Sequence, residues 1–250
     1  MNVFVSGGSR GIGRAIALRL ARDGAAFGQP VRVGIGYFRS DAAAEVTAEE
    51  LRALGAEPVL VRGNITSERV LEEVAALGPL DVLVHNAASG VSVPALEAKE
   101  KHWDWTVNTN ARALLQLAQV AAPSMPDGSS IVAISSLGAQ RVLDNYTLVG
   151  TSKAALEALV RYLAVELAPS IRVNAVSGGV VETDALDAFP NREEMLAAGR
   201  ANPIGRMVES NDIADAVAFL CSKDADMIRG QTIVVDGGFS LLVGGPGAQA

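Results

Sequence analysis

The sequence predicts a single α/β domain of the doubly wound Rossmann type, with a seven-stranded parallel sheet flanked by helices. Three observations predict it. Short apolar segments rich in Val and Ile alternate with helix-like segments along the chain, a glycine cluster follows the first of them, and no linker-like segment divides the sequence. Strands that are apolar on both faces indicate a parallel sheet buried between helices. Repeated strand–helix alternation indicates right-handed crossovers.

The predicted strands are short and apolar, and the segments between them are amphipathic or rich in alanine. The strands span Asn2–Ser6, Val31–Tyr37, Pro58–Arg62, Asp81–His85, Ser130–Ser135, Ile171–Val176 and Thr232–Val235. The helices span Gly11–Asp23, Asp41–Leu54, Ser67–Leu77, Glu100–Ala121, Thr151–Ala168 and Asn211–Ser222. A longer turn is expected at Ala25–Pro30.

We expect the domain to cover residues 1–243 and the tail 244–250 to be disordered. A substrate lid is expected at about 183–207, because this segment follows the sixth strand and lacks clean strand alternation. Ligands of doubly wound sheets bind at the carboxyl ends of the strands, which is where such a segment would lie.

The composition argues against several classes of function. The formal net charge is −7 and the pI about 4.9, which disfavours nucleic acid and anionic membranes as partners. The only cysteine, Cys221, cannot form an intramolecular disulfide, and we interpret it as a small buried hydrophobe. No signal peptide or membrane-spanning stretch is evident, and His85 and His102 are too isolated to suggest a metal site. We therefore expect a soluble, cytoplasmic protein.

The glycine cluster predicts a dinucleotide site. Its spacing is Gly7-x3-Gly11-x-Gly13, placed between the first strand and the first helix. Gly7 permits a positive φ in the tight turn. Gly11 allows the backbone to approach a pyrophosphate, and Gly13 allows the helix to pack closely on the sheet. The helix N-terminus favours phosphate. The expected contacts come from Gly7, Ser9, Arg10, Gly11, Ile12 and Gly13.

The end of the second strand favours NADPH over NADH. An acidic residue there would bind the 2′-hydroxyl of NAD, but the chain has Arg39 and Ser40 instead. Arg39 offers a permanently charged fork for a 2′-phosphate, and Arg10 can reach the same corner. The alternative is that Arg39 is a solvated surface charge. Asp41 is expected to cap the next helix.

With these motifs in order, the chain resembles the short-chain dehydrogenase/reductase family over about residues 2–243. The resemblance rests on the glycine loop, Asn64, His85-Asn86-Ala87-Ala88, Asn108-Thr109-Asn110, Ser135-Ser136, Lys153 and Val235-Asp236-Gly237-Gly238. It implies further cofactor contacts from Asn64, Ile65, Asn86, Ala87, Ala88, Lys153, Gly179, Val181 and Thr183. Asn64 would lie on the adenine and Thr183 on the nicotinamide carboxamide.

One departure concerns the catalytic tyrosine. The family's Tyr-x3-Lys pair would require tyrosine at position 149, where the chain has Val149; it has Tyr146-x6-Lys153 instead. This spacing resembles the NADPH-dependent enoyl-acyl-carrier-protein reductase III branch, the FabL type. The strings at 86–90, 102–106, 176–179 and 225–230 also resemble that branch. The resemblance implies reduction of the trans-2 double bond of an enoyl thioester in fatty-acid or polyketide biosynthesis.

Conjugate reduction places the developing charge on the thioester oxygen, farther from the nicotinamide than in carbonyl reduction. A tyrosine three residues upstream shifts its hydroxyl away from Lys153, in the direction that an enoyl thioester requires. Tyr146 would then hydrogen-bond the enolate oxygen. Lys153 would hold the ribose hydroxyls and, if close enough, lower the pKa of the tyrosine. Ser136 and Asn110 are further catalytic candidates: Ser136 could contact substrate, and Asn110 could hold a helix kink and a water.

Alternatives stay open for the activity. The chain could be an NADPH-dependent ketoreductase of a polyketide or 3-oxoacyl substrate, or an NADP(H)-binding redox sensor without catalysis. In a ketoreductase, Tyr146 would be a repositioned catalytic group. In a redox sensor, it would be an aromatic residue that only packs.

The substrate is expected to be a small molecule or an acyl group on coenzyme A or an acyl carrier protein. Arg192, Arg200 and Arg206 could contact an acidic carrier protein, or could simply be solvated. Alanine-rich helices resemble those through which the family oligomerises, which implies a homotetramer. Trp103 and Trp105 are interpreted as core or helix packing.

Overall fold

The computed structural model describes residues 1–183, 186 and 192–242 of the chain, and it contains one seven-stranded parallel sheet. The strand order is β3-β2-β1-β4-β5-β6-β7, so the chain reverses direction across the sheet between β1 and β4. The strands are β1 (Asn2–Ser6), β2 (Arg32–Tyr37), β3 (Glu57–Arg62), β4 (Val82–His85), β5 (Ser129–Ser136), β6 (Ile171–Gly178) and β7 (Thr232–Val235). The predicted fold class is therefore confirmed. Two strands have the predicted bounds, and the ends of the other five are shifted by one or two residues.

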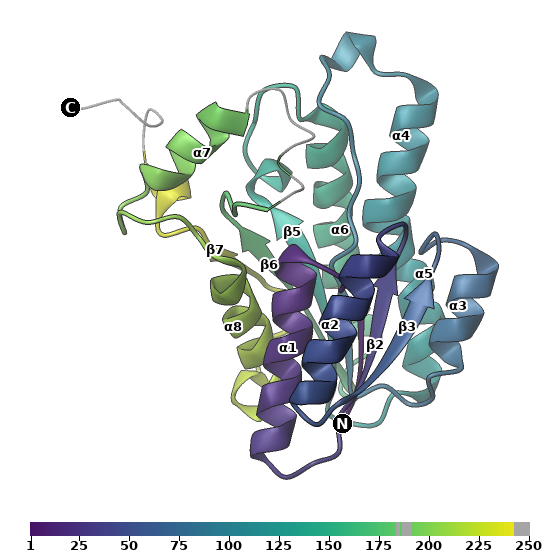
Figure 1. Cartoon of the computed structure of the whole chain (residues 1–250). Helices are drawn as coiled ribbons and strands as arrows, with labels where there is room; N and C mark the ends of the chain where they lie inside the picture. Colours follow the sequence, from purple (N-terminus) through teal and green to yellow (C-terminus); the bar gives the residue numbers. More distant parts are fainter. Residues whose placement is uncertain (184–185, 187–191, 243–250) are drawn as a thin grey trace.

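Helices cover both faces of the sheet (Figure 1). One face carries α1 (Gly11–Ala26), α2 (Asp41–Ala53) and α8 (Ser210–Cys221), and the other carries α3 (Glu68–Ala75), α4 (Glu100–Val107), α5 (Ala113–Ala121) and α6 (Thr147–Glu166). A further helix, α7 (Arg192–Arg200), lies in the predicted lid. Two buried apolar clusters, one on each side of the sheet, form the core, as expected for strands that are apolar on both faces.

The strand register aligns the carboxyl ends of the strands. Ser6 at the end of β1 pairs with Gly36 of β2 and His85 of β4. On the other side, Ser136 at the end of β5 pairs with Gly178 of β6. The glycine loop and the predicted catalytic segment therefore emerge at one edge, beside the point where the strand order reverses, which is where doubly wound sheets bind ligands.

The predicted helix Glu100–Ala121 is not continuous. A π-helical turn, Asn108–Arg112, separates α4 from α5. Insertions of this kind recur at functional sites because they re-aim a side chain. Here the turn contains Asn110, which is fully buried. Asn110 therefore lies in an irregular turn of the helix, and its role in holding a water stays a prediction.

Other boundaries also differ from the prediction. Helix α6 begins at Thr147 rather than Thr151, so Tyr146 is its N-cap residue. Helix α1 continues to Ala26, which shortens the predicted turn to residues 27–30. Trp103 and Trp105 on α4 are 44% and 49% exposed, so neither is a core residue, and only the interpretation as helix packing remains. The tail 243–250 and residues 184–185 and 187–191 of the predicted lid lie outside the described residues.

Cys221 behaves as a hydrophobic residue. It is partly buried and packs against the core cluster beneath α1 and α8. Burial raises the pKa of its thiol to about 12, so the reactive thiolate is scarce at neutral pH. Within the described part of the chain, no helix combines the length and the apolar character that crossing a bilayer requires.

Candidate active site

The glycine loop packs so closely that side chains would not fit at two of its positions. A Cβ at Gly13 would lie 2.1 Å from the carbonyl oxygen of Gly7, and Gly7 itself has a φ of +67°. Among the described side chains, none caps the start of α1, and its first turn contains no acidic residue. The first backbone N–H groups of α1 can therefore be directed at an anionic group. This tight loop and its open helix N-terminus fit the pyrophosphate of a dinucleotide.

Asn86 and Ser6 fix the loop to the neighbouring strand. The Asn86 amide donates to the carbonyl oxygens of Ser6 at 3.2 Å and Gly7 at 3.0 Å. In return, the Ser6 hydroxyl oxygen accepts from the backbone N–H groups of Asn86 at 3.1 Å and Ala87 at 3.0 Å. On the opposite side, Thr47 of α2 donates to the carbonyl oxygen of Ser9 at 2.8 Å. The loop is thus held before any ligand binds.

The corner after β2 matches the requirement for a 2′-phosphate. Asp41 is not the helix cap that was predicted: Ser40 occupies the N-cap position, without a side-chain cap hydrogen bond. The Asp41 carboxylate instead accepts from the Tyr37 hydroxyl at 3.0 Å and pairs with Arg62 at 3.3 Å. Arg39 is exposed, and its guanidinium lies 4.8 Å from the ring centroid of Phe38. The Asp41 carboxylate is thus engaged by Arg62 and Tyr37, whereas Arg39 is exposed to solvent.

The remaining predicted cofactor residues fall into two groups. Thr183 adjoins the glycine loop, since its methyl group would lie 3.3 Å from a Cβ at Gly11. Asn64 is exposed after β3, and its side chain accepts from the backbone and hydroxyl of Thr66 at 3.1 and 3.0 Å. Ile65 and Val181 bury their side chains in the core. Only their backbone, like that of Gly179, can serve a cofactor.

Tyr146 directs its phenol toward the end of β5. The hydroxyl lies 3.3 Å from the hydroxyl of Ser136. Burial raises the pKa of Tyr146, and the hydrogen bond with Ser136 opposes this shift. Lys153 was expected to lower this pKa if it lay close enough, but the net shift is upward and burial is its largest cause. The phenol therefore remains protonated at neutral pH and can act as a hydrogen-bond donor.

Gly138 makes room for the tyrosine ring, and Gly150 makes room for the carbonyl group of Gly138. A Cβ at Gly138 would lie 2.5 Å from two ring carbons of Tyr146, and a Cβ at Gly150 would lie 2.6 Å from the carbonyl oxygen of Gly138. Val149 occupies the position of the family's usual tyrosine and packs tightly on Gly90. A Cβ at Gly90 would lie 2.3 Å from a methyl group of Val149. The local sequence is therefore built around a phenol at position 146.

Lys153 is buried in α6 at the same edge of the sheet. Its ammonium donates to the carbonyl oxygen of Ile134 at 2.7 Å, one residue before the Ser135-Ser136 end of β5. Burial lowers the pKa of Lys153 to about 8, and the charge of Glu157 opposes this shift. Lys153 is not a solvated surface residue, since only 4% of it is exposed.

Asn110 connects the segment after β4 to helix α6. Its side-chain amide donates to the carbonyl oxygen of Ser89 at 2.9 Å and to the hydroxyl of Ser152 at 2.8 Å, and its side-chain oxygen accepts from the Ser89 N–H at 2.7 Å. His85 lies between Ser6 and Asn110: its ring nitrogens are 3.1 Å from the Ser6 hydroxyl and 3.1 Å from the Asn110 carbonyl oxygen. Burial lowers the pKa of His85 to about 3, so it is neutral.

Comparison with known proteins supplies the deciding observation. The family described as Enoyl-(Acyl carrier protein) reductase matches residues 7–240. A solved short-chain dehydrogenase from Burkholderia cenocepacia, in complex with NADP, superposes with a TM-score of 0.85 at 32% identity and covers 95% of this chain and 97% of its own. The chain belongs to the short-chain dehydrogenase/reductase family.

Two curated relatives of this short-chain dehydrogenase/reductase carry names that give different substrates. A 1-cyclohexenylcarbonyl-CoA reductase from Streptomyces collinus is 38% identical, over 96% of this chain and 86% of its own length. A 3-oxoacyl-[acyl-carrier-protein] reductase, FabG, from Staphylococcus aureus is 36% identical, over 96% of this chain and 98% of its own length. The family assignment therefore makes the chain an oxidoreductase without choosing between these reactions.

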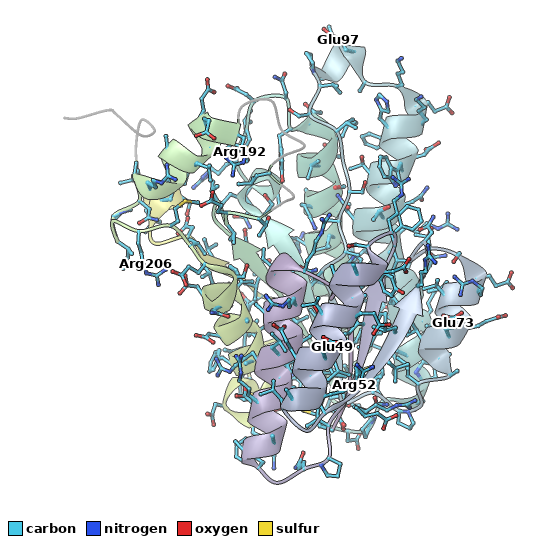
Figure 2. The ribbon with its side chains drawn as sticks, viewed as in Figure 1. Glu49, Arg52, Glu73, Glu97, Arg192 and Arg206 are labelled. Carbon is cyan, nitrogen blue, oxygen red and sulfur yellow. The ribbon has the colours of Figure 1, made fainter. Side chains whose placement is uncertain are left out.

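Two of the three arginines predicted to contact a carrier protein form ion pairs within the chain. Figure 2 shows Arg192 on α7 and Arg206 in the segment that leads to α8. Arg192 pairs with Glu182 at 3.1 Å and with Glu193 at 2.7 Å, and Arg206 pairs with Asp212 at 2.6 Å. These pairs weaken the positive field at the rim. Within the residues that the structure describes, no cluster of His, Cys, Asp and Glu could hold a metal ion.

Sequence reasoning missed the residues that support this reductase site. Gly138 and Gly150 flank the tyrosine, and a glycine on each side of a catalytic candidate is a signal that could have been used. Ser152, His85 and Glu157 could not have been found in this way. Their roles depend on contacts between α6, β4 and the π-helical turn, which only the folded chain brings together.

Proposed function

We propose that this short-chain dehydrogenase/reductase uses NADPH to reduce the trans-2 double bond of an enoyl thioester carried by coenzyme A or an acyl carrier protein. The supporting observation is the Tyr146-x6-Lys153 arrangement, in which the phenol lies on Ser136 and Val149 fills the usual tyrosine position against Gly90. The phenol thereby enters the site before the start of α6 rather than from its first turn, as the longer reach to a thioester oxygen requires.

The residues of the site divide the work of this reaction. Gly7, Gly11 and the start of α1 would hold the pyrophosphate, Arg39 the 2′-phosphate, and Lys153 the nicotinamide ribose. NADPH, when bound, supplies the hydride. Tyr146, which is neutral, would donate its hydrogen bond to the thioester oxygen as negative charge develops there. Ser136 orients the phenol, and Asn110 fixes the wall formed by Ser89.

A ketoreductase is the second candidate, and a specific contact favours it. The hydroxyl groups of Ser136 and Tyr146 lie 3.3 Å apart, so both could donate hydrogen bonds to one carbonyl oxygen. The FabG relative is also named as a 3-oxoacyl reductase. In this case the phenol would donate a proton to the oxygen on the carbon that receives hydride. The two candidates share every cofactor contact and differ only in where the substrate oxygen lies.

The decisive test compares two thioesters of equal chain length. We expect the purified protein to oxidise NADPH with a higher kcat/KM on crotonyl-CoA than on acetoacetyl-CoA, measured by absorbance at the NADPH band. Faster turnover of acetoacetyl-CoA would assign the ketoreductase function instead. The same pair on an acyl carrier protein would then establish which carrier is preferred.

Arg39→Ala tests the cofactor assignment. We expect the Kd for NADPH to rise roughly 10- to 100-fold, because one charge-assisted hydrogen-bonding group is lost, while the Kd for NADH stays the same. Both are measured by fluorescence titration. Arg52→Ala, on the exposed far end of α2, is the matched control and should change neither value. An equal loss of affinity for both cofactors would mean that Arg39 supports the loop rather than the 2′-phosphate.

The quaternary structure belongs to the same proposal. Tyr162 and Val165 on α6 are 70% and 78% exposed, and such apolar side chains on an alanine-rich helix suit contact with a second copy of the chain. We propose that the protein is cytoplasmic and forms a homotetramer. Size-exclusion chromatography coupled to light scattering would measure the molar mass of that tetramer.

A further inference from the structure

Glu157 is a buried carboxylate for which the mechanism above has no use. It lies on α6 one helical turn after Lys153, and only 4% of the residue is exposed. Its two oxygens accept from the Ser135 hydroxyl at 2.7 Å and from the Gln140 amide at 3.0 Å. A buried carboxylate is costly unless it is paired and hydrogen-bonded. The position of these partners indicates what the carboxylate does.

Both hydrogen-bond partners belong to the segment that carries the catalytic hydroxyl groups. Ser135 immediately precedes Ser136, and Gln140 ends the short turn, Leu137–Ala139, that contains Gly138. The Gly138 N–H donates to the Ser136 hydroxyl at 3.3 Å, and Gly138 faces the ring of Tyr146. Glu157 therefore connects α6 to both ends of the turn on which the tyrosine ring rests.

The same carboxylate acts on Lys153 through its charge. Residues four apart on a helix lie on the same face, so Glu157 and Lys153 are neighbours, and the carboxylate raises the pKa that burial lowers to about 8. Two other titratable groups belong to the site, His85 on β4 and Tyr146. Both are neutral near pH 8, since burial lowers the pKa of His85 to about 3 and raises that of Tyr146. Within the described residues, Glu157 is the charge that stabilises the Lys153 ammonium.

We propose that Glu157 is a positioning residue of the reductase site, which keeps Lys153 protonated and braces the Ser136–Gln140 turn against Tyr146. The carboxylate touches neither cofactor nor substrate. The proposal rests on the NADPH reduction proposed above but not on the choice between enoyl and keto substrates, because both use Lys153, Ser136 and Tyr146.

The proposal predicts a pH dependence with a defined sign. Lys153 must be an ammonium to bind the ribose, so activity is fully present below its pKa and is lost as the pH rises through about 8. Removing the Glu157 charge lowers that pKa further. In Glu157→Gln the alkaline limb of kcat/KM for NADPH, which reports the free enzyme, should move down by roughly one to two pH units.

A direct readout of Lys153 needs no turnover. The lysines of the chain are Lys99, Lys101, Lys153 and Lys223, so the side-chain carbon signals of a protein labelled with 13C-lysine can be resolved and titrated by NMR. Lys153→Arg identifies the signal by its absence. In Glu157→Gln the titration midpoint of Lys153 should fall with the kinetic limb, while the other lysines stay unchanged.

Two control variants separate charge from bracing. Glu157→Asp keeps the charge but shortens the reach, so the Lys153 midpoint should stay near that of the wild type. Gln140→Met removes one hydrogen bond at an exposed position, and kcat should fall severalfold without a shift of the alkaline limb. If Glu157→Gln does not fold, the double variant Ser135→Ala/Glu157→Met, which removes the carboxylate together with its buried hydroxyl partner, carries the same expectation for the Lys153 midpoint.

The outcomes distinguish this proposal from the proposed function. An unchanged Lys153 midpoint in folded Glu157→Gln overturns the electrostatic role, whatever substrate is reduced. Full activity in both Gln140→Met and Glu157→Asp overturns the bracing role. If no thioester is turned over but the Lys153 midpoint still falls, the proposed function fails while the effect of Glu157 on Lys153 stands.

Discussion

Replacing Tyr146 with phenylalanine is expected to lower kcat by roughly 10²- to 10³-fold, the effect of removing one preorganised oxyanion donor. The phenol is protonated, since burial raises its pKa, and its hydroxyl lies 3.3 Å from Ser136 at the end of β5. Phenylalanine preserves the ring that fills the slot beside Gly138. The change therefore removes the donor and leaves the packing, and the Kd for NADPH should stay the same. Steady-state kinetics and fluorescence titration measure the two quantities.

Tyr162→Phe provides a matched control for this experiment. Tyr162 lies on the same helix and is 70% exposed. Its hydroxyl therefore has no access to the site, and phenylalanine keeps the ring that would contact a second copy of the chain, so kcat should be unaffected. Should Tyr146→Phe retain the wild-type kcat, the phenol would be only a packing group, and the chain would have to reduce its substrate without it. Loss of NADPH binding in Tyr146→Phe would likewise contradict the division of roles between Tyr146 and Lys153.

The fold was predictable because local pattern and global architecture agree. Strands such as Asn2–Ser6 and Thr232–Val235 are confirmed to the residue, since apolar runs between glycine-rich turns leave little freedom in their placement. Helix ends were harder to predict. The start of α6 at Thr147 depends on Asn145, whose φ of 56° turns the chain into the helix and whose carbonyl oxygen accepts from the Val93 N–H at 3.2 Å. That hydrogen bond joins residues far apart in the sequence, so no local sequence pattern predicts it.

The predicted site residues illustrate the same limit. Position within a motif pointed to Tyr146, Ser136 and Lys153. All three side chains lie near the end of β5, and their catalytic roles stay predictions. The electrostatics could not be predicted in this way, because they depend on burial. The pKa of Tyr146 is raised rather than lowered, and burial of the phenol is the largest cause. The exposure of Trp103 and Trp105 is another feature that a helical pattern alone could not reveal.

Gly138→Ala is expected to lower kcat by up to about 10²-fold while leaving the Kd for NADPH unchanged. The added Cβ would lie 2.5 Å from two carbons of the Tyr146 ring, and normal contact would require the ring to move by most of an ångström. A misplacement of about 1 Å can cost that factor in a reaction that depends on alignment. Gly138 does not have a positive φ, so alanine introduces no backbone strain of its own.

A double-mutant cycle isolates the route of this effect. If Gly138 acts only through the tyrosine, then Gly138→Ala should have little further effect on kcat in the Tyr146→Phe background, because the hydroxyl that the methyl group displaces is already absent. Additive losses would instead show that the methyl group disturbs Ser136, which accepts from the Gly138 N–H at 3.3 Å. Non-additivity is the expected behaviour of groups in direct contact, and its presence would connect the Tyr-x6-Lys spacing to the glycine that makes room for it.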